Sequence, residues 1–233
     1  MTEVHIIDNI TKEYPNMFKV CSFKNPRIYV TEERIKRPKE LVDEDYIPKI
    51  SSLSRTKTLI HDLILCNDFE LFCTFTFDPD KVDRFSFNAC SAKMSTWIHH
   101  QKNRSPDFKY LIVPEQHKSG AWHFHALISH YNGSLRDSKH ISSTGRRVYN
   151  VTSFRSGFST AVHIDDPNAV ANYVSKYITK DFIRYFNRRR FACSRNLRRP
   201  IKYINSDILR NTPPLFKTKT YDDLDYSYYT ITF

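Results

Sequence analysis

The sequence predicts an α+β fold, in which helices pack against a central antiparallel β-sheet. Residues 71–77 and 122–128 are rich in β-branched and aromatic side chains, which is typical of strands. A third strand is predicted at residues 109–116, and the short connection that follows it contains Gly120, as expected for a hairpin. Two longer segments carry apolar residues at helical spacing, residues 82–101 and 166–186.

The other elements of this domain follow from local patterns. Residues 51–66 have an imperfect apolar stripe, which predicts a helix. The polar segment 131–158 is predicted to be a connecting loop, and residues 159–164 a further strand. Asp166 and Pro167 begin the last helix, because Asp is a favoured N-cap and Pro is tolerated in the first turn.

Composition indicates a folded protein with one main domain. The chain has 233 residues, of which 40% are hydrophobic and 14% aromatic. We expect an N-terminal extension at 1–50, the domain at 51–205 and a C-terminal tail at 206–233. Five cysteines without metal-type spacing indicate a reduced compartment. Since no apolar run approaches the length of a membrane span and no secretory pattern opens the chain, we expect a cytoplasmic protein.

The predicted hairpin carries a candidate metal site. His123 and His125 are two residues apart on one strand, so their side chains share a face. A three-residue turn places Glu115 opposite His123, on that same face. Two imidazoles and a carboxylate suit Mn²⁺ or Mg²⁺ as well as Zn²⁺. His117 is the rival third ligand, and the alternative is a pair of histidines at a polar rim.

A second cluster lies in the last predicted helix. Tyrosine and lysine residues recur there at the i, i+3, i+4 and i+7 positions of one helical face, namely Tyr173, Lys176, Tyr177 and Lys180. A tyrosine hydroxyl is a weak nucleophile at its ordinary pKa, and nearby lysines favour the phenolate and stabilise charge on phosphate. The alternative is that both tyrosines simply pack beside the apolar stripe of this helix.

The formal net charge of +11 is concentrated near the end of the domain. Residues 176–202 contain ten Lys and Arg against one acid, Asp181, a local net charge of +9. Aromatic residues are interleaved with these charges, which favours single-stranded nucleic acid over a plain solvated surface. The candidate DNA-binding residues are Arg184, Arg188, Arg189, Arg190, Arg195, Arg198 and Arg199.

Three sequence blocks together resemble the HUH endonucleases, the rolling-circle replication initiators of small single-stranded DNA phages and plasmids. LFCTFTFDP (71–79) is similar to the first motif, WHFHALI (122–128) to the His-hydrophobic-His motif, and YVSKYITK (173–180) to the tyrosine motif of two-tyrosine phage initiators. The resemblance covers roughly residues 51–200. It implies a sheet of about five antiparallel strands, a central histidine strand, and a tyrosine helix across the metal face.

The resemblance also implies a function. The family nicks and rejoins single-stranded origin DNA with Mn²⁺ or Mg²⁺, through a 5′-phosphotyrosine intermediate. In the family an upstream carboxylate can complete the metal site, and Glu115 matches that position. With only four glycines and no phosphate-cradling loop, unwinding would fall to a host helicase and replication machinery in a bacterial cytoplasm. The alternatives are a relaxase, a single-strand transposase, or a non-catalytic single-strand-binding module.

Overall fold

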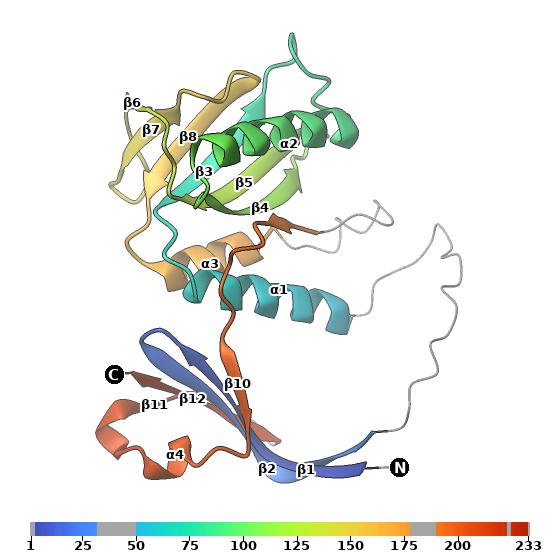
Figure 1. Cartoon of the computed structure of the whole chain (residues 1–233), viewed down its shortest axis with the longest axis vertical. Coiled ribbons are helices and arrows are strands. Elements are labelled where there is room, and N and C mark those ends of the chain that lie inside the picture. The colour runs from blue at the N-terminus through green and yellow to red at the C-terminus, as the bar shows by residue number, and fades with distance from the viewer. Residues whose placement is uncertain (1–2, 32–49, 178–189, 223–224, 233) are drawn as a thin grey trace. The chain divides into compact units, whose positions relative to one another are not determined.

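The structure is a computed structural model that describes residues 3–31, 50–177, 190–222 and 225–232. The chain forms two compact units. The larger unit comprises residues 44–198, and the smaller comprises residues 1–43 and 199–233 (Figure 1). The predicted boundaries after residues 50 and 205 therefore differ from the observed ones, after residues 43 and 198. No described helix is long and apolar enough to cross a membrane.

The larger unit is built on an antiparallel sheet with the strand order β6-β7-β8-β3-β5-β4-β9. The α+β class is confirmed, but the expectation of about five strands is wrong, because this sheet has seven. The strands are β3 (Leu71–Phe77), β4 (Lys109–Gln116), β5 (Trp122–Ser129), β6 (Leu135–Ile141), β7 (Arg147–Val151), β8 (Gly157–His163) and β9 (Ala192–Cys193).

The additional strands have no clear hydrophobic alternation. β6 and β7 lie in the segment predicted to be a loop, and most of their side chains are exposed or half-buried. β6 is the outermost strand of the sheet, so polar residues are tolerated along it. β9 is only two residues long and lies in the basic stretch.

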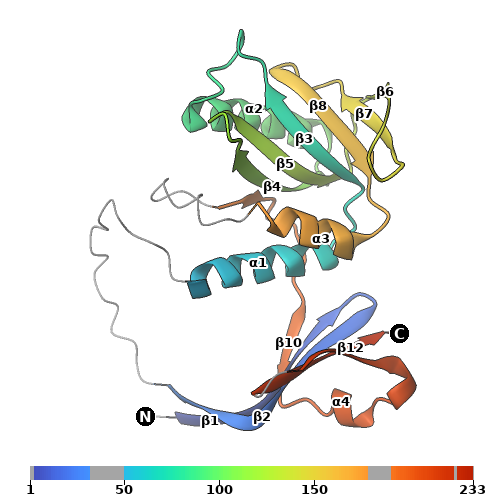
Figure 2. The ribbon, with the colours of Figure 1, turned by 180° about the vertical axis from the view of Figure 1, so that it is seen from behind.

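Helices cover both faces of this sheet (Figures 1 and 2). On one face, α2 (Phe87–Arg104) contributes Cys90, Met94 and Trp97 to a core that includes Phe75. On the opposite face, α1 (Ile50–Leu65) and α3 (Pro167–Ser175) pack over apolar side chains of β4 and β5. The second face is the one that carries the histidines, because residues 123 and 125 alternate with the α2-facing residues of β5.

The last helix begins as predicted. The side chain of Asp166 caps it by accepting hydrogen bonds from the backbone N–H groups of Asn168, at 2.9 Å, and Ala169, at 3.1 Å. The helix ends at Ser175, not at residue 186. The remainder of the expected helix falls largely in residues 178–189, which lie outside the described residues.

The smaller unit joins the two ends of the chain in one five-stranded antiparallel sheet. Its order is β10-β1-β2-β12-β11, so β1 and β2 from the N-terminal segment pair with strands that follow the larger unit. An extension and a separate tail were expected, but pairing between segments so distant in the sequence leaves no local signal. The elements are β1 (Glu3–Tyr14), β2 (Met17–Thr31), β10 (Ile201–Ile204), α4 (Ile208–Asn211), η2 (Pro214–Phe216), β11 (Lys217–Asp222) and β12 (Tyr226–Thr232).

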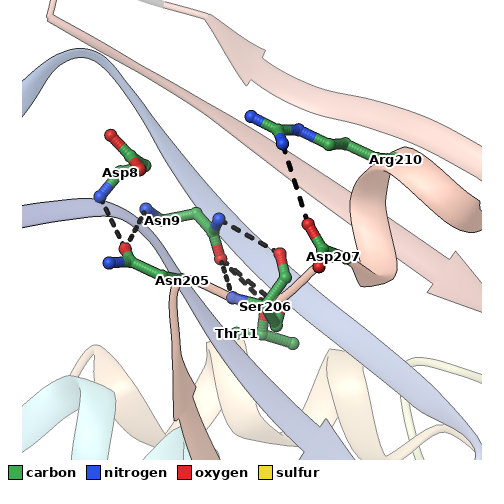
Figure 3. Close-up of polar contacts among 7 residues, drawn as sticks. All are labelled: Asp8, Asn9, Thr11, Asn205, Ser206, Asp207 and Arg210. Atoms are coloured by element: carbon green, nitrogen blue, oxygen red, sulfur yellow. Dashed lines mark hydrogen bonds and ion pairs between the residues drawn. The ribbon is translucent and has the colours of Figure 1, made fainter.

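Polar contacts fasten β10 to β1 at the end of their pairing (Figure 3). The Asn205 side-chain oxygen accepts a 2.7 Å hydrogen bond from the backbone N–H of Asp8. The hydroxyls of Thr11 and Ser206 are 2.6 Å apart, and Asn9 bonds to the Ser206 backbone. Asn205 has a φ of +55°, a conformation that Asn adopts more readily than most residues. These contacts fix where β10 ends.

Candidate active site

The histidine hairpin has the register that the sequence predicts. Glu115 on β4 pairs with His123 on β5, and Val113 pairs with His125. Paired residues of an antiparallel ladder share a face, so Glu115, His123 and His125 all lie on the face covered by α1 and α3. The three proposed ligands therefore come from two adjacent strands.

A three-residue turn sets this register. The backbone N–H of His117 donates to the carbonyl of Ala121 at 2.8 Å and closes the loop of residues 118–120. Gly120 has a φ of +88°, in the left-handed region where a side chain is strained. A shift of one residue at this turn would move both histidines to the other face.

Two threonines on β3 hold the histidine rings from the other side. Thr74 Oγ1 is 3.1 Å from His125 Nδ1, and Thr76 Oγ1 is 3.1 Å from His123 Nδ1. Each threonine is also the cross-strand partner of the histidine that it bonds. Because Nδ1 is engaged in both rings, Nε2 is the nitrogen left for another ligand.

In the structure, Glu115 bonds directly to a histidine. His125 Nε2 and Glu115 Oε2 are 2.7 Å apart, and since a carboxylate can only accept, His125 donates. Its Nδ1 then accepts from the Thr74 hydroxyl. The hydrogen bond from His125 lowers the pKa of Glu115 against the opposing effect of burial. The pKa of His123 is also lowered, mainly by burial. Both shifts favour the forms that bind metals, carboxylate and neutral imidazole.

These groups are not arranged around one point. Among the residues that the structure describes, no three His, Cys, Asp or Glu side chains form a metal-binding cluster. His117, the rival ligand, has its ring centre 5.6 Å from that of His123, and its Nδ1 is 3.1 Å from Ser119 Oγ. A metal at Glu115 and His125 requires the hydrogen bond between them to open.

The tyrosines at the end of α3 lie against the histidine face. The Tyr177 ring stacks on His125, with ring centres 3.9 Å apart and planes inclined by 16°. Tyr173 contacts Tyr177 edge-on, at 5.3 Å between ring centres, and also contacts Phe72. The structure thus brings together the tyrosine and histidine blocks, which are about 50 residues apart in the sequence.

The two tyrosines differ in environment. Tyr173 is 44% exposed, whereas Tyr177 is half-buried. The pKa of Tyr177 is raised well above its ordinary value, first by burial, then by its hydrogen bond with Tyr173, and further by the charge of Glu115. In this state the Tyr177 phenolate is disfavoured.

The expected single helical face is described only in part. Tyr177 follows α3 in a tighter turn, because its N–H donates to the carbonyl of Val174, three residues back, at 3.1 Å. Lys176 has its ammonium nitrogen 5.8 Å from the Tyr173 ring centre, so it lies near that tyrosine. Lys180 lies outside the described residues.

The basic residues do not all have the same role. Arg190 donates to Thr56 Oγ1 at 3.1 Å, and Arg198 pairs with Asp68 at 3.3 Å, so each helps to fasten the segment after α3. Arg195 is exposed, and Arg199 is the first residue of the smaller unit's C-terminal segment. The other candidates fall in the part of the chain without described coordinates, namely Arg184, Arg188 and Arg189.

Thr74 and Thr76 are site residues that the sequence analysis missed. The signal was present in LFCTFTF, where two hydroxyl residues alternate with buried Cys73, Phe75 and Phe77. Period-two alternation places both threonines on one face of a strand. Only the pairing of β3 with β5 shows that they meet the histidines.

Comparison with known proteins supports a role in replication. A family model for replication-associated proteins, named after the ORF2 protein, matches residues 70–182, a span that begins just before β3 and includes both histidines and both tyrosines. Neither the curated proteins nor the solved structures gave a significant match. Over about half of its length, the chain therefore resembles a family of replication-associated proteins, as expected for a rolling-circle replication initiator.

Proposed function

We propose that this protein initiates rolling-circle replication by nicking and rejoining single-stranded DNA at an origin, with a tyrosine nucleophile and a divalent metal. The observation that carries the proposal is the stacking of Tyr177 on His125, at 3.9 Å between ring centres. A nucleophile next to a metal ligand is the arrangement that a metal-assisted phosphodiester cleavage needs. The family match adds independent support for a role in replication.

The donors on the histidine face fit a divalent ion by their chemistry. Two imidazoles with engaged Nδ1 atoms and one ionised carboxylate suit Mn²⁺ or Mg²⁺. The proposed ligands are Glu115, His123 and His125, with His117 as the alternative to Glu115. When bound, the ion would polarise the scissile phosphate. The threonine hydroxyls can donate or accept, so they can hold the rings with or without the ion.

The chain's own residues supply the nucleophile. A tyrosine oxygen forms a bond to phosphorus as the bond between phosphorus and the 3′ oxygen breaks. The phenolic proton leaves and the 3′ oxygen takes up a proton, giving a 3′-hydroxyl and a 5′-phosphotyrosine. Attack by a 3′-hydroxyl on the phosphotyrosine reverses the step and seals a strand. Lys176 and Lys180 are proposed to stabilise charge on the phosphate oxygens.

Activation of Tyr177 depends on the state of Glu115. The carboxylate charge is one of the causes that raise the pKa of Tyr177. If Glu115 is engaged by a cation, this contribution is offset and the phenolate becomes more accessible. Tyr173 touches Tyr177 and is more exposed, so it is proposed to act as the second nucleophile of a replication round.

One observation favours a different function. The direct bond between Glu115 and His125, together with the half-buried Tyr177, is also what a non-catalytic single-strand-binding domain would have. A relaxase or single-strand transposase would share the proposed chemistry and differ only in the DNA that it cuts. Covalent attachment to origin DNA separates these functions.

The test is formation of a covalent complex between the protein and labelled single-stranded origin DNA in Mn²⁺, detected on a denaturing gel. We expect a complex with native protein, a reduced complex with Tyr173→Phe or Tyr177→Phe, and none with the double variant. Tyr149→Phe, on β7 away from the histidines, is the matched control. A complex that persists in the double variant would place the nucleophile elsewhere, and no complex with native protein would favour the binding domain.

A further inference from the structure

An exposed phenylalanine lies beside the histidines on the same face. Phe158 on β8 pairs with Thr76 on β3, and Thr76 pairs on its other side with His123. The three residues form one cross-strand row, so the Phe158 side chain shares the histidine face. Phe158 is 58% exposed, while Ser159 and Ala161 on the other face of β8 are buried. An apolar ring is therefore left in solvent two strands from His123, with only Thr76 between them.

A second exposed phenylalanine lies at the turn of the histidine hairpin. Phe85 is 56% exposed, and its Cδ1 would be 3.6 Å from a Cβ placed on Gly120. The ring thus rests against the turn that precedes β5. The backbone N–H of Phe85 donates to Asp83 Oδ1 at 3.0 Å, which shapes the loop between β3 and α2.

The residue before Phe85 supplies a positive charge at this position. The carbonyl of Arg84 accepts from the backbone N–H of Trp122 at 2.8 Å, one residue before His123. The guanidinium carbon of Arg84 is 5.4 Å from the Phe85 ring centre. Its Nε is buried and has no hydrogen-bond partner among the described residues. The charge of Arg84 also contributes to the lowered pKa of His123, so its field reaches the site.

These groups match the chemistry of a single-stranded nucleic acid. Aromatic rings stack on unpaired bases whatever their sequence, and arginine binds the phosphates between them. One ring lies on the β8 side of His123, and the other lies at the hairpin turn with the arginine beside it. A protein partner would also cover exposed phenylalanines, but it would not call for a cation next to a phosphate-cleaving site.

We propose that Phe158 and Phe85 stack on DNA bases on either side of the phosphate to be cut, and that Arg84 binds a neighbouring phosphate. This assignment rests on the proposed function, because it takes the histidine face as the place where DNA is cut. The rings would hold the strand across the face, and the arginine would fix its position along the strand.

The first test measures DNA binding without cleavage. Affinity for a fluorescein-labelled 12-nucleotide oligo(dT) is followed by anisotropy in EDTA. Phe158→Ala and Phe85→Ala should each weaken binding about 5- to 150-fold, the range for losing one stacked base. Phe216→Ala removes a 49%-exposed ring from the smaller unit and should leave affinity unchanged. Thermal melting of each variant checks that it folds.

Two further readouts separate stacking from general structure. Phe158→Trp should bind oligo(dT) like native protein, and its fluorescence should be quenched by the stacked base, because native Trp97 and Trp122 are only 5% and 1% exposed. Arg84→Gln should lower the slope of log affinity against log salt by about 0.7, the value for one phosphate contact on a single strand. Arg104→Gln, at the far end of α2, should not.

The outcomes distinguish this inference from the proposed function. Normal affinity in both alanine variants, with no quenching in Phe158→Trp, would overturn the stacking role even if covalent complexes form. Lost affinity and quenching without any covalent complex would support the stacking role and remove the nicking activity. Binding of a protein in place of DNA would appear as unchanged oligo(dT) affinity, and would also overturn it.

Discussion

Replacing Thr74 by valine tests whether the β3 hydroxyl holds His125 in position for a metal. Valine keeps the shape of threonine and removes only the hydroxyl, so the 3.1 Å hydrogen bond with His125 Nδ1 can no longer form. His125 is 5% exposed, so water cannot readily replace the hydroxyl, and an unsatisfied buried group costs about 1–3 kcal/mol. The melting temperature should fall by about 2–4 °C for each kcal/mol.

Metal affinity gives the sharper readout of this prediction. Loss of a residue that orients a metal-binding histidine typically lowers affinity about 10- to 100-fold. Titration with Mn²⁺ by calorimetry should show this loss in Thr74→Val and recovery in Thr74→Ser, which keeps a hydroxyl. Thr160→Val makes the same change on β8, one strand further from His125, and should leave metal affinity unchanged.

The reasoning would be refuted by a particular pair of results. If Thr74→Val lost stability but bound Mn²⁺ within about twofold of native protein, the hydroxyl would serve folding alone. Thr76→Val should be milder in stability, because its partner His123 is half-buried and water can reach it. Equal losses of stability in the two variants would show that burial does not set the cost.

Three further predictions concern other parts of the chain. Glu115→Ala should lower Mn²⁺ affinity more than His117→Ala, since Glu115 bonds to His125 directly, and the reverse order in calorimetry would make His117 the ligand. When basic residues become glutamine, the slope of single-strand affinity against salt should fall by about 0.7 for each phosphate that is no longer bound, and an unchanged slope would make them a solvated surface; these residues are Arg188, Arg189, Arg190, Arg195, Arg198 and Arg199. The hydrogen bond from Lys219 holds the pKa of Asp222 below its ordinary 3.8, so Asp222 stabilises the fold above that pH and the effect is lost as pH falls below it. Asp222→Asn should therefore narrow the difference in melting temperature between pH 7 and pH 3, and an unchanged difference would count against this pair.

The histidine hairpin could be predicted from sequence because its information is local. A three-residue turn with Gly120 and strict alternation along β5 determine which residues face each other, and the observed register agrees. Contacts from β3 could not be found in the same way. The pairing of Thr74 with His125 spans 51 residues, and strand order is not written in any single segment.

The missed strands and the terminal sheet have a similar cause. β6 and β7 lie at an edge of the sheet, where solvent-facing positions do not demand apolar residues. In the smaller unit, β12 pairs with β2 from the opposite end of the chain, so neither segment carries a signal for the other. Sequence patterns identify what a segment can form more readily than what it pairs with.

The split of the smaller sheet between the two ends of the chain has a consequence for synthesis. As a nascent chain leaves the ribosome, β1 and β2 emerge first and wait for β10 and β12, while residues 44–198 already contain a complete core. Domains generally fold as units as they are made, so the larger unit can fold during this interval. The terminal sheet closes only after translation reaches β12, with a large loop to span. Early termination would thus spare the histidines and tyrosines and leave the first hairpin with exposed strand edges, a substrate for aggregation or proteolysis.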